Sequence, residues 1–328
     1  MKNTINKNIF IRFNPFSSKS ISPTLVIVYF LMAAFFAIKN PIFISLKNYQ
    51  TIATNAPIIG IVALGLGMVL LTGNVDLSVG STAGLVAVIS ALILRNTDFP
   101  IMVVLLIAIL IGLVIGTING LIVNYIGVNS IITTLGMWAA LKGAAMIISG
   151  GTIYFSNKGF QLISKGFAFG IIPNVLIYFI IIIILMYLTL RYTKFGRNIY
   201  LVGANSISAR AVGINVKRTK FLVFLLSSSF AAFAGILLVS QFAGAAYNYG
   251  TGWEFKALTI CIVGGISLNG GRGTYVGLFL SLLIIGSLSN GLTMINMPIY
   301  WRDFFEGSIL LLAIIIDSFR VKNFKEDT

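Results

Sequence analysis

Two long stretches without a charged residue, 171–190 and 221–244, set the strongest constraint on the fold of this chain. A helix needs about 20 mostly apolar residues to cross the hydrocarbon core of a bilayer, and both stretches reach that length. Strands of a membrane barrel would alternate polar and apolar side chains, and these stretches do not. The chain is also 58% hydrophobic and only 9% charged, more apolar than a soluble domain can cover with polar surface. We therefore predict an all-α integral membrane protein.

Apolar runs recur along the chain and predict about ten transmembrane helices, some of them broken. The expected spans are 25–38, 53–72, 79–94, 101–123, 131–148, 171–190, 221–244, 257–268, 275–292 and 304–316. The second span ends just before Asp76, and the eighth is short and ends among glycines. Broken helices in two halves of a chain are typical of transporter folds. Gly112 and Gly116 form a GxxxG pair, which allows close packing inside the bundle or at a dimer seam.

The formal net charge of +15 is concentrated where loops leave the predicted membrane domain. Loop 191–220 carries seven basic residues and no acidic one. Such an excess of Lys and Arg marks cytoplasmic segments, and an even number of spans places both ends on that side. We predict a cytoplasmic N-terminal segment (1–21), a transmembrane domain (22–318) that includes this loop, and a cytoplasmic tail (319–328). Because the charge has this explanation, we expect no nucleic-acid partner.

The first run is short enough for a cleaved signal peptide, but a retained anchor is the preferred interpretation. Lys39, Asn40 and Pro41 follow the run, and they lack the small-residue pattern of a cleavage site.

The residue types that carry covalent chemistry are scarce. The chain has no histidine, one cysteine (Cys261) and eight carboxylates, and the G-x-x-x-x-G-K-[ST] loop that wraps nucleotide phosphates is absent. Metal ligation, nucleophilic catalysis and structural disulfides lack raw material. We therefore predict no catalytic residue, no metal site and no cofactor, and we expect any ATP that powers the protein to be hydrolysed by another chain.

The basic loop contains one short predicted helix. Asn205 or Ser206 can cap it, and Gly213 suits the left-handed position at its end. A helix of two turns is marginal alone in water, so its apolar Ile207 and Val212 are best explained by docking into a groove on another protein. The alternative is an ordinary surface helix packed on its own chain.

Four motifs occur in order along the chain. They are Gly-Asn-Val-Asp-Leu-Ser-Val-Gly-Ser from Gly73, the loop segment 196–220, Gly-Thr-Gly-Trp-Glu-Phe-Lys-Ala from Gly250, and Val-Gly-Gly-Ile-Ser-Leu-Asn-Gly-Gly-Arg-Gly from Val263. Together they closely resemble the inner-membrane permeases of ribose-type sugar ABC importers, a family that includes ribose, xylose, arabinose, galactoside and autoinducer-2 permeases. The similarity is collinear over residues 48–317.

This resemblance implies the permease subunit of an ATP-binding-cassette importer that moves a sugar or sugar-like solute into the cytoplasm. It also implies a bacterial inner-membrane location and three partners: a cytoplasmic ABC ATPase, an extracytoplasmic solute-binding protein, and a second permease copy or a sister permease. The family's ATPase-coupling helix maps onto residues 205–213. The implied coupling residues are Gly196, Arg197, Gly203, Asn205, Ala209, Gly213 and Ile214.

The sequence departs from the family pattern at two places. Asn74-Val75-Asp76 stands where Gly-Ile-Asp is usual, and Lys256 stands where an acidic residue is common. Contacts with the binding protein and sugar preference are therefore not carried over.

Asp76 is a carboxylate expected at membrane depth, where a charge costs a few kcal/mol. With Ser78 it could cap the broken helix and shape the gate. The alternative is a plain N-cap whose carboxylate accepts hydrogen bonds from the N–H of Val79 or Gly80. The residues expected at the gate or along the solute pathway are Asp76, Ser78, Asn55 and Asn119.

Trp253 and Glu254 fall on a predicted outer loop. They could dock the binding protein, or they could form a solvated loop end with an interfacial tryptophan. Lys142 lies in a predicted helix with Trp138 and is either snorkelling to the interface or paired inside the bundle.

Two rival functions remain at the level of sequence. A permease of the same family for nucleosides or a furanone signal would share these features. An ion-driven secondary transporter would normally bury several ionisable residues, and this chain offers very few.

Overall fold

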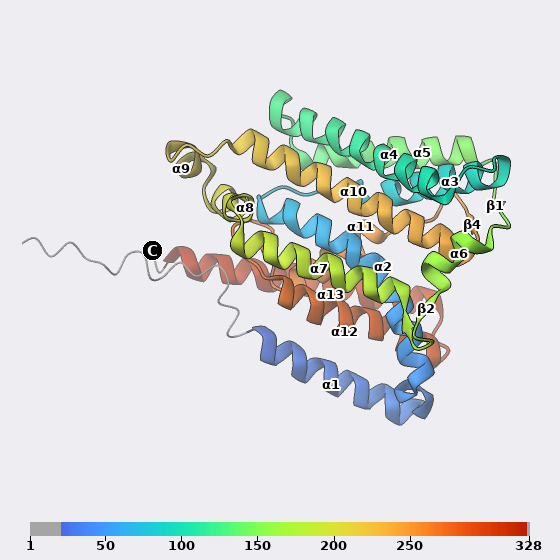
Figure 1. The fold of residues 1–328 in the computed structure, drawn as a ribbon. Helices are drawn as coiled ribbons and strands as arrows, with labels where there is room; N and C mark the ends of the chain where they lie inside the picture. Colours follow the sequence, from blue (N-terminus) through green and yellow to red (C-terminus); the bar gives the residue numbers. More distant parts are fainter. Residues whose placement is uncertain (1–20, 327–328) are drawn as a thin grey trace, which may run out of the picture.

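The computed structural model describes residues 21–326 as a bundle of long helices that run along a common direction (Figure 1). Among these residues, seven helices are long and apolar enough to cross a membrane. They are α2 (Leu46–Leu71), α3 (Val79–Asn96), α4 (Ile101–Leu121), α5 (Ser130–Ser149), α7 (Asn174–Tyr192), α10 (Val216–Phe242) and α12 (Tyr275–Met294). A single π turn, η2 (Ile122–Ile126), extends α4. The predicted all-α membrane architecture is confirmed.

The three other expected spans also coincide with helices: α1 (Ile21–Lys39), α11 (Trp253–Val263) and α13 (Ile299–Glu326). The prediction for α11 was displaced, because the helix begins four residues before the expected span 257–268. It ends at Val263 with Gly264 as its C-cap, and Gly265 follows with a positive φ of 87°. α13 continues through most of the expected tail. The predictions for residues 1–20 and 327–328 lie outside the described residues.

Several short elements were not predicted. The helical ones are η1 (Pro41–Ile44), α6 (Lys158–Lys165) and α8 (Lys194–Ala204), while α9 (Ser206–Ala211) is the short helix that the basic loop predicted. Strands β1 (Ile153–Tyr154) and β4 (Gly244–Ala245) pair antiparallel, as do β2 (Phe167–Ala168) and β3 (Ile172–Pro173). These strands have two residues each, too few for a period-2 pattern to show in the sequence.

The two ends of the bundle differ in content. The start of α1, the helices α8 and α9, and the end of α13 lie at one end, which we call the α9 end (Figure 1). The helix α6 and the strand pairs lie at the opposite, α6 end. The expectation that both chain termini share a side with the basic loop therefore holds for the first and last described helices.

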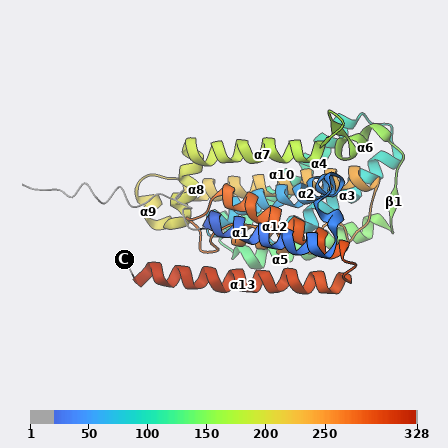
Figure 2. The same cartoon turned by 90° about the horizontal axis from the view of Figure 1, so that it is seen from below.

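The centre of the bundle is built on α2 and α10. α10 packs against α2, α3 and α4, and α2 also packs against α7, α11 and α12. Helices α4, α5 and α7 bury only a minority of their residues, and α7 and α13 run along opposite sides of the molecule (Figure 2). Such helices present apolar side chains to lipid.

The GxxxG pair of α4 is an internal contact. A Cβ at Gly112 would lie 2.6 Å from Ala232 Cβ, and one at Gly116 would lie 2.8 Å from Leu225 Cα. Both neighbours are on α10, so the two glycines allow α4 and α10 to approach closely. Of the two positions that the sequence allowed for this pair, inside the bundle or at a dimer seam, the structure shows the position inside the bundle.

Candidate functional site: a buried carboxylate cluster and the loop at the α9 end

The segment between α2 and α3 leaves helical geometry inside the bundle. Backbone N–H groups at membrane depth must find partners inside the protein, and here α5 supplies them. The N–H of Val75 donates to Ser130 Oγ at 3.2 Å, and the N–H of Leu77 donates to Thr134 Oγ1 at 3.0 Å. The break is thus held in place by hydroxyl groups on one neighbouring helix.

Asp76 lies in this segment and is fully buried. Its Oδ1 accepts hydrogen bonds from the Ser78 N–H (3.0 Å) and the Ser78 hydroxyl (2.6 Å). Its Oδ2 accepts one from Ser227 Oγ on α10 at 3.0 Å. The predicted bonds from Val79 or Gly80 were wrong, because the carboxylate turns back onto Ser78, which is itself the N-cap residue of α3.

Asn119 on α4 joins the same group. Its Nδ2 donates to Ser78 Oγ at 2.9 Å, so four residues, Asp76, Ser78, Asn119 and Ser227, form one connected network that we call the polar cluster. Within the part of the chain that the structure describes, Asn119 Oδ1 has no hydrogen-bond partner, nor has the hydroxyl of Ser228 on α10. Buried polar atoms without a partner are uncommon, so the polar cluster has hydrogen-bonding capacity that the described residues do not use.

Asn55, the fourth predicted pathway residue, does not contact the polar cluster. It lies in the first half of α2 and accepts a hydrogen bond from Gln241 Nε2 on α10 at 2.5 Å. Asn55 is exposed. The structure therefore brings three of the four predicted residues together and places the fourth apart.

Glu254 does not lie on an exposed loop, as its sequence context predicted, but in the first turn of α11 with 3% of its surface exposed. Gly80 in the first turn of α3 makes room for it, since a Cβ at Gly80 would collide with Glu254 Oε2. This oxygen has no hydrogen-bond partner among residues 21–326. Trp253 is half-buried and packs against the central core. Glu254 is thus not accessible to a docking protein in this conformation.

Two residues of α5 face Glu254. The Trp138 indole and the Lys142 ammonium both lie near enough to the carboxylate to interact with it electrostatically. The Lys142 ammonium lies 5.1 Å from the centre of the Trp138 ring, a distance typical of a cation–π contact. Lys142 therefore stacks on a tryptophan of its own helix and lies near Glu254, without a close ion pair to it among the described residues.

The loop at the α9 end forms the short helix that was predicted. Asn205 is its N-cap, and Oδ1 accepts hydrogen bonds from the N–H groups of Ile207 (2.9 Å) and Ser208 (3.0 Å). Gly213 follows the helix with a φ of +83°, a conformation that glycine adopts without strain. Ile207 and Val212 are 83% and 74% exposed. An exposed apolar pair on so short a helix is suited to docking on another surface.

The rest of α9 is anchored to its own chain. Ala209 is buried in a small cluster with Val202 and Val216, and Ile214 packs at its edge. The N–H of Ile214 donates to the Ala209 carbonyl at 3.1 Å. One face of α9 therefore packs on the protein while the other protrudes.

The unpredicted helix α8 links α9 to the bundle. At its start, Gly196 packs so closely on the end of α7 that a Cβ would collide with the Thr189 carbonyl, while Arg197 is exposed. Near its end, Gly203 touches the backbone of Leu71 and Gly271, and the Gly271 N–H donates to the Leu71 carbonyl at 2.8 Å. Leu71 is the last residue of α2, five residues before Asp76.

Tyr200 fixes the middle of α8. Its hydroxyl donates to the Gly273 carbonyl at 2.9 Å, and burial raises the pKa of this phenol well above its ordinary value. The Tyr200 hydroxyl therefore keeps its proton, and remains a hydrogen-bond donor, throughout the physiological pH range. The sequence signal for this junction was the run of glycines near Gly271, which predicted only the end of a broken helix.

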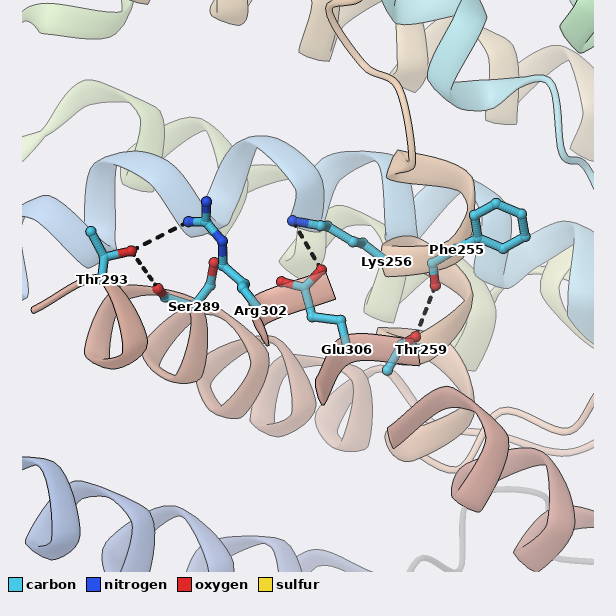
Figure 3. Close-up of polar contacts among 7 residues, drawn as sticks. All are labelled: Phe255, Lys256, Thr259, Ser289, Thr293, Arg302 and Glu306. Atoms are coloured by element: carbon cyan, nitrogen blue, oxygen red, sulfur yellow. Dashed lines mark hydrogen bonds and ion pairs between the residues drawn. The ribbon is translucent and has the colours of Figure 1, made fainter. Parts of the chain in front are cut away.

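At the α6 side, α11 is tied to α13 by an ion pair (Figure 3). Lys256 Nζ lies 3.0 Å from Glu306 Oε2, and Glu306 is 8% exposed. Next to it, Arg302 Nη1 donates to Thr293 Oγ1 on α12 at 3.3 Å. The basic residue at position 256 thus has an internal partner.

Comparison with known proteins agrees with this architecture. The family described as "Branched-chain amino acid transport system / permease component" matches residues 48–314. The galactose/methyl galactoside import permease protein of Escherichia coli (strain K12) is 32% identical over 314 residues, which cover 90% of this chain and 94% of the relative. No solved structure matches this chain.

Two further relatives have different cargo in their names. The autoinducer 2 import system permease protein of Enterobacter sp. (strain 638) is 35% identical over 85% of this chain and 81% of its own length. The ribose import permease protein of Bacillus subtilis (strain 168) is 34% identical over 88% and 90%. With this coverage and a bundle of apolar helices, the chain belongs to the family of transport-system permease components and is a multi-pass membrane protein.

Proposed function

We propose that this chain is the transmembrane permease subunit of an ATP-binding-cassette importer that carries a sugar or sugar-like solute into the bacterial cytoplasm. The observation that carries the proposal is collinear similarity, at 32–35% identity over 85–90% of the chain, to permeases named for galactosides, ribose and autoinducer 2. The family description names branched-chain amino acids, but these relatives favour a polyhydroxylated cargo.

The α9 end faces the cytoplasm in this proposal. Seven basic residues and no acidic one lie in loop 191–220, and such loops stay on the cytoplasmic side during insertion. A cytoplasmic ATPase docks on the exposed side chains of Ile207 and Val212. ATP is bound and hydrolysed by that partner alone, so the permease needs no cofactor of its own.

A chain of direct contacts connects the docking helix to the polar cluster. α9 packs on α8 through Ala209, α8 meets the end of α2 at Gly203 and Leu71, and the segment after Leu71 carries Asp76. Movement of α9 by the ATPase therefore reaches the broken segment without crossing a flexible linker. There it changes how Asp76 and Ser227 hold α3 against α10.

The solute is delivered from the α6 end by an extracytoplasmic binding protein and passes between two permease subunits. Polar groups such as Asn55 and Gln241 offer amide donors and acceptors to hydroxyl groups. The second subunit is a copy of this chain or a sister permease.

The test is uptake by proteoliposomes that contain the permease together with its partner ATPase and binding protein. Labelled galactose, ribose, autoinducer 2, a nucleoside and leucine are compared, with an ATPase variant lacking its phosphate-loop lysine as control. We expect uptake of at least one sugar or of autoinducer 2 that requires ATP hydrolysis. Uptake of leucine alone would contradict the cargo, and uptake driven by an ion gradient without the ATPase would contradict the mechanism.

A further inference from the structure

A pocket of about 210 Å³ lies at the α9 end, between the end of α7, the middle of α8 and the start of α12. Its polar lining comes from Tyr187, Arg191, Tyr200 and Thr274, and Val276 forms part of the apolar wall. Pockets that enclose whole organic ligands span about 300–1,000 Å³. This one is smaller, which suits a compact chemical group better than an entire solute.

The side chains that line the pocket are arranged as hydrogen-bond donors. Arg191 Nη1 donates to the Tyr187 oxygen at 2.7 Å, and the Gly277 N–H donates to Thr274 Oγ1 at 3.2 Å. Both hydroxyl oxygens therefore act as acceptors already. Neither hydroxyl proton has an acceptor within residues 21–326, so both remain available to a ligand.

The charge of the pocket is positive. Arg191 contributes a guanidinium group, and no carboxylate is among the lining residues that the structure describes. The guanidinium is held over two rings, 5.8 Å from the Tyr187 ring and 5.6 Å from the Tyr192 ring. Stacking of this kind orients the planar fork of arginine, which matches the oxygens of a phosphate group. A cation with two neighbouring hydroxyl donors is the chemistry of an anion site.

The surroundings of the pocket indicate where the anion comes from. One face of α7 is apolar and exposed from Ile181 to the end of the helix; its side chains are Ile181 (51%), Ile184 (51%), Leu185 (56%), Leu188 (43%) and Tyr192 (64%). These positions lie on one side of the helix, and Arg191 follows directly at the edge of this stripe. On the opposite wall, Val276 is 50% exposed. Lipid tails that cover this face would bring their headgroups to Arg191.

We propose that this pocket, which we call the Arg191 pocket, binds the phosphate group of an anionic phospholipid in the leaflet at the α9 end. Arg191 pairs with the phosphate oxygens, and the hydroxyl groups of Tyr187 and Thr274 donate to them. Basic pockets between transmembrane helices are suited to such headgroups. The bound lipid contacts α7, α8 and α12 together, and α8 leads directly into α9. Lipid binding would therefore stabilise the packing of these three helices. This inference does not depend on the identity of the transported solute.

The experiment measures lipid binding to the full-length chain purified from membranes, by native mass spectrometry with titrated phosphatidylglycerol or phosphatidylcholine. We expect phosphatidylglycerol to bind and phosphatidylcholine to bind at least about tenfold more weakly, because its choline group opposes Arg191. Arg191→Gln should weaken phosphatidylglycerol binding by about tenfold, and Tyr187→Phe and Thr274→Val by about threefold each. Tyr187→Phe keeps the ring, so a loss there would report the hydroxyl group and not misfolding.

Arg218→Gln is the matched control, because Arg218 is an exposed arginine at the same end of the bundle and lies outside the pocket. It should leave phosphatidylglycerol binding unchanged. Equal binding of both lipids, or full binding to Arg191→Gln, would overturn the proposal. Saturation by inorganic phosphate or glycerol 3-phosphate at equal concentration would assign the site to a soluble anion and overturn the lipid assignment. Loss of ATPase binding in Arg191→Gln with lipid binding intact would assign the pocket to the partner protein.

Discussion

Ser227 Oγ lies 3.0 Å from Asp76 Oδ2, a hydrogen bond between residues 151 positions apart in the chain. It attaches α10, at the centre of the bundle, to the broken segment between α2 and α3. Because Asp76 is fully buried, the bond is shielded from competing water and is a firm link between the two elements. Any movement that separates α3 from α10 must break it or carry both helices together.

Replacement of Asp76 by Asn should leave the protein inserted and folded but slow its transport. Asn keeps the size of the side chain and an oxygen that accepts from Ser78, but its amide cannot accept from Ser227. We expect ATP-driven uptake to fall by about tenfold or more, the effect of about 1.4 kcal/mol on a barrier. Asp98→Asn, at an exposed carboxylate between α3 and α4, is the control. Uptake equal to that of the unaltered protein would remove Asp76 from the gate.

Ser227→Ala removes the donor of the hydrogen bond to Asp76, and its effect is measured as a change in the free energy of unfolding. It leaves Asp76 Oδ2 without its donor, and we expect a loss of about 0.5–1.5 kcal/mol in the free energy of unfolding, seen as a lower Tm in detergent. Ser229→Ala is the matched control, since its hydroxyl donates only within its own helix, to the Leu225 carbonyl at 2.8 Å. If both variants lose the same amount, the link to Asp76 contributes nothing specific.

Gly213→Val should abolish association with the ATPase while the permease remains inserted. Valine is strained at the φ of +83° found here, so the end of α9 must rearrange and displace Ile207 and Val212. Pull-down of the ATPase from solubilised membranes measures the effect. Gly127→Val provides the comparison, because Gly127 has a φ of +92° and, like Gly213, would place an added Cβ more than 4 Å from any neighbouring atom. Retained association in Gly213→Val would count against α9 as the coupling helix.

The Lys256–Glu306 pair predicts a charge-swap result. The side chain of Glu306 is only 10% exposed and its Oε1 has no other partner among the described residues. Lys256→Glu should therefore destabilise the α11–α13 contact by about 1–3 kcal/mol, measured as a fall in Tm. Glu306→Lys should act likewise, and the double variant should recover most of the loss.

Lys47→Glu, at an exposed lysine at the start of α2, controls for the same change of net charge as Lys256→Glu. Additive losses in the double variant would mean that the two side chains do not interact.

The helices could be predicted because each carries its own signal. Residues 221–244 and the other long apolar runs are long enough to span a bilayer, and that requirement is local to the run. The same holds for α9, where Asn205 and Gly213 have the chemistry of a cap and a stop. α8 was missed because it mixes Arg197 and Asn198 with apolar residues over only about three turns, so no membrane-length run marks it.

Glu254 shows the limit of local reasoning. Its neighbours Gly250 and Gly252 predict a loop, and a carboxylate in a loop is normally solvated. Its burial is made possible by Gly80 on α3 and by Trp138 and Lys142 on α5. Nothing near residue 254 in the sequence signals these distant partners.

The sequence by itself determined the membrane location, the transmembrane helices, the basic loop and the short capped helix within it, because apolar length, charge and capping act over a few neighbouring residues. Only the tertiary structure decided which polar groups meet: Asp76 with Ser227, Asn119 with Ser78, and Lys256 with Glu306. These contacts join residues of different helices, and their positions depend on how closely backbones pack at glycines such as Gly80 and Gly203. That packing is a property of the whole bundle.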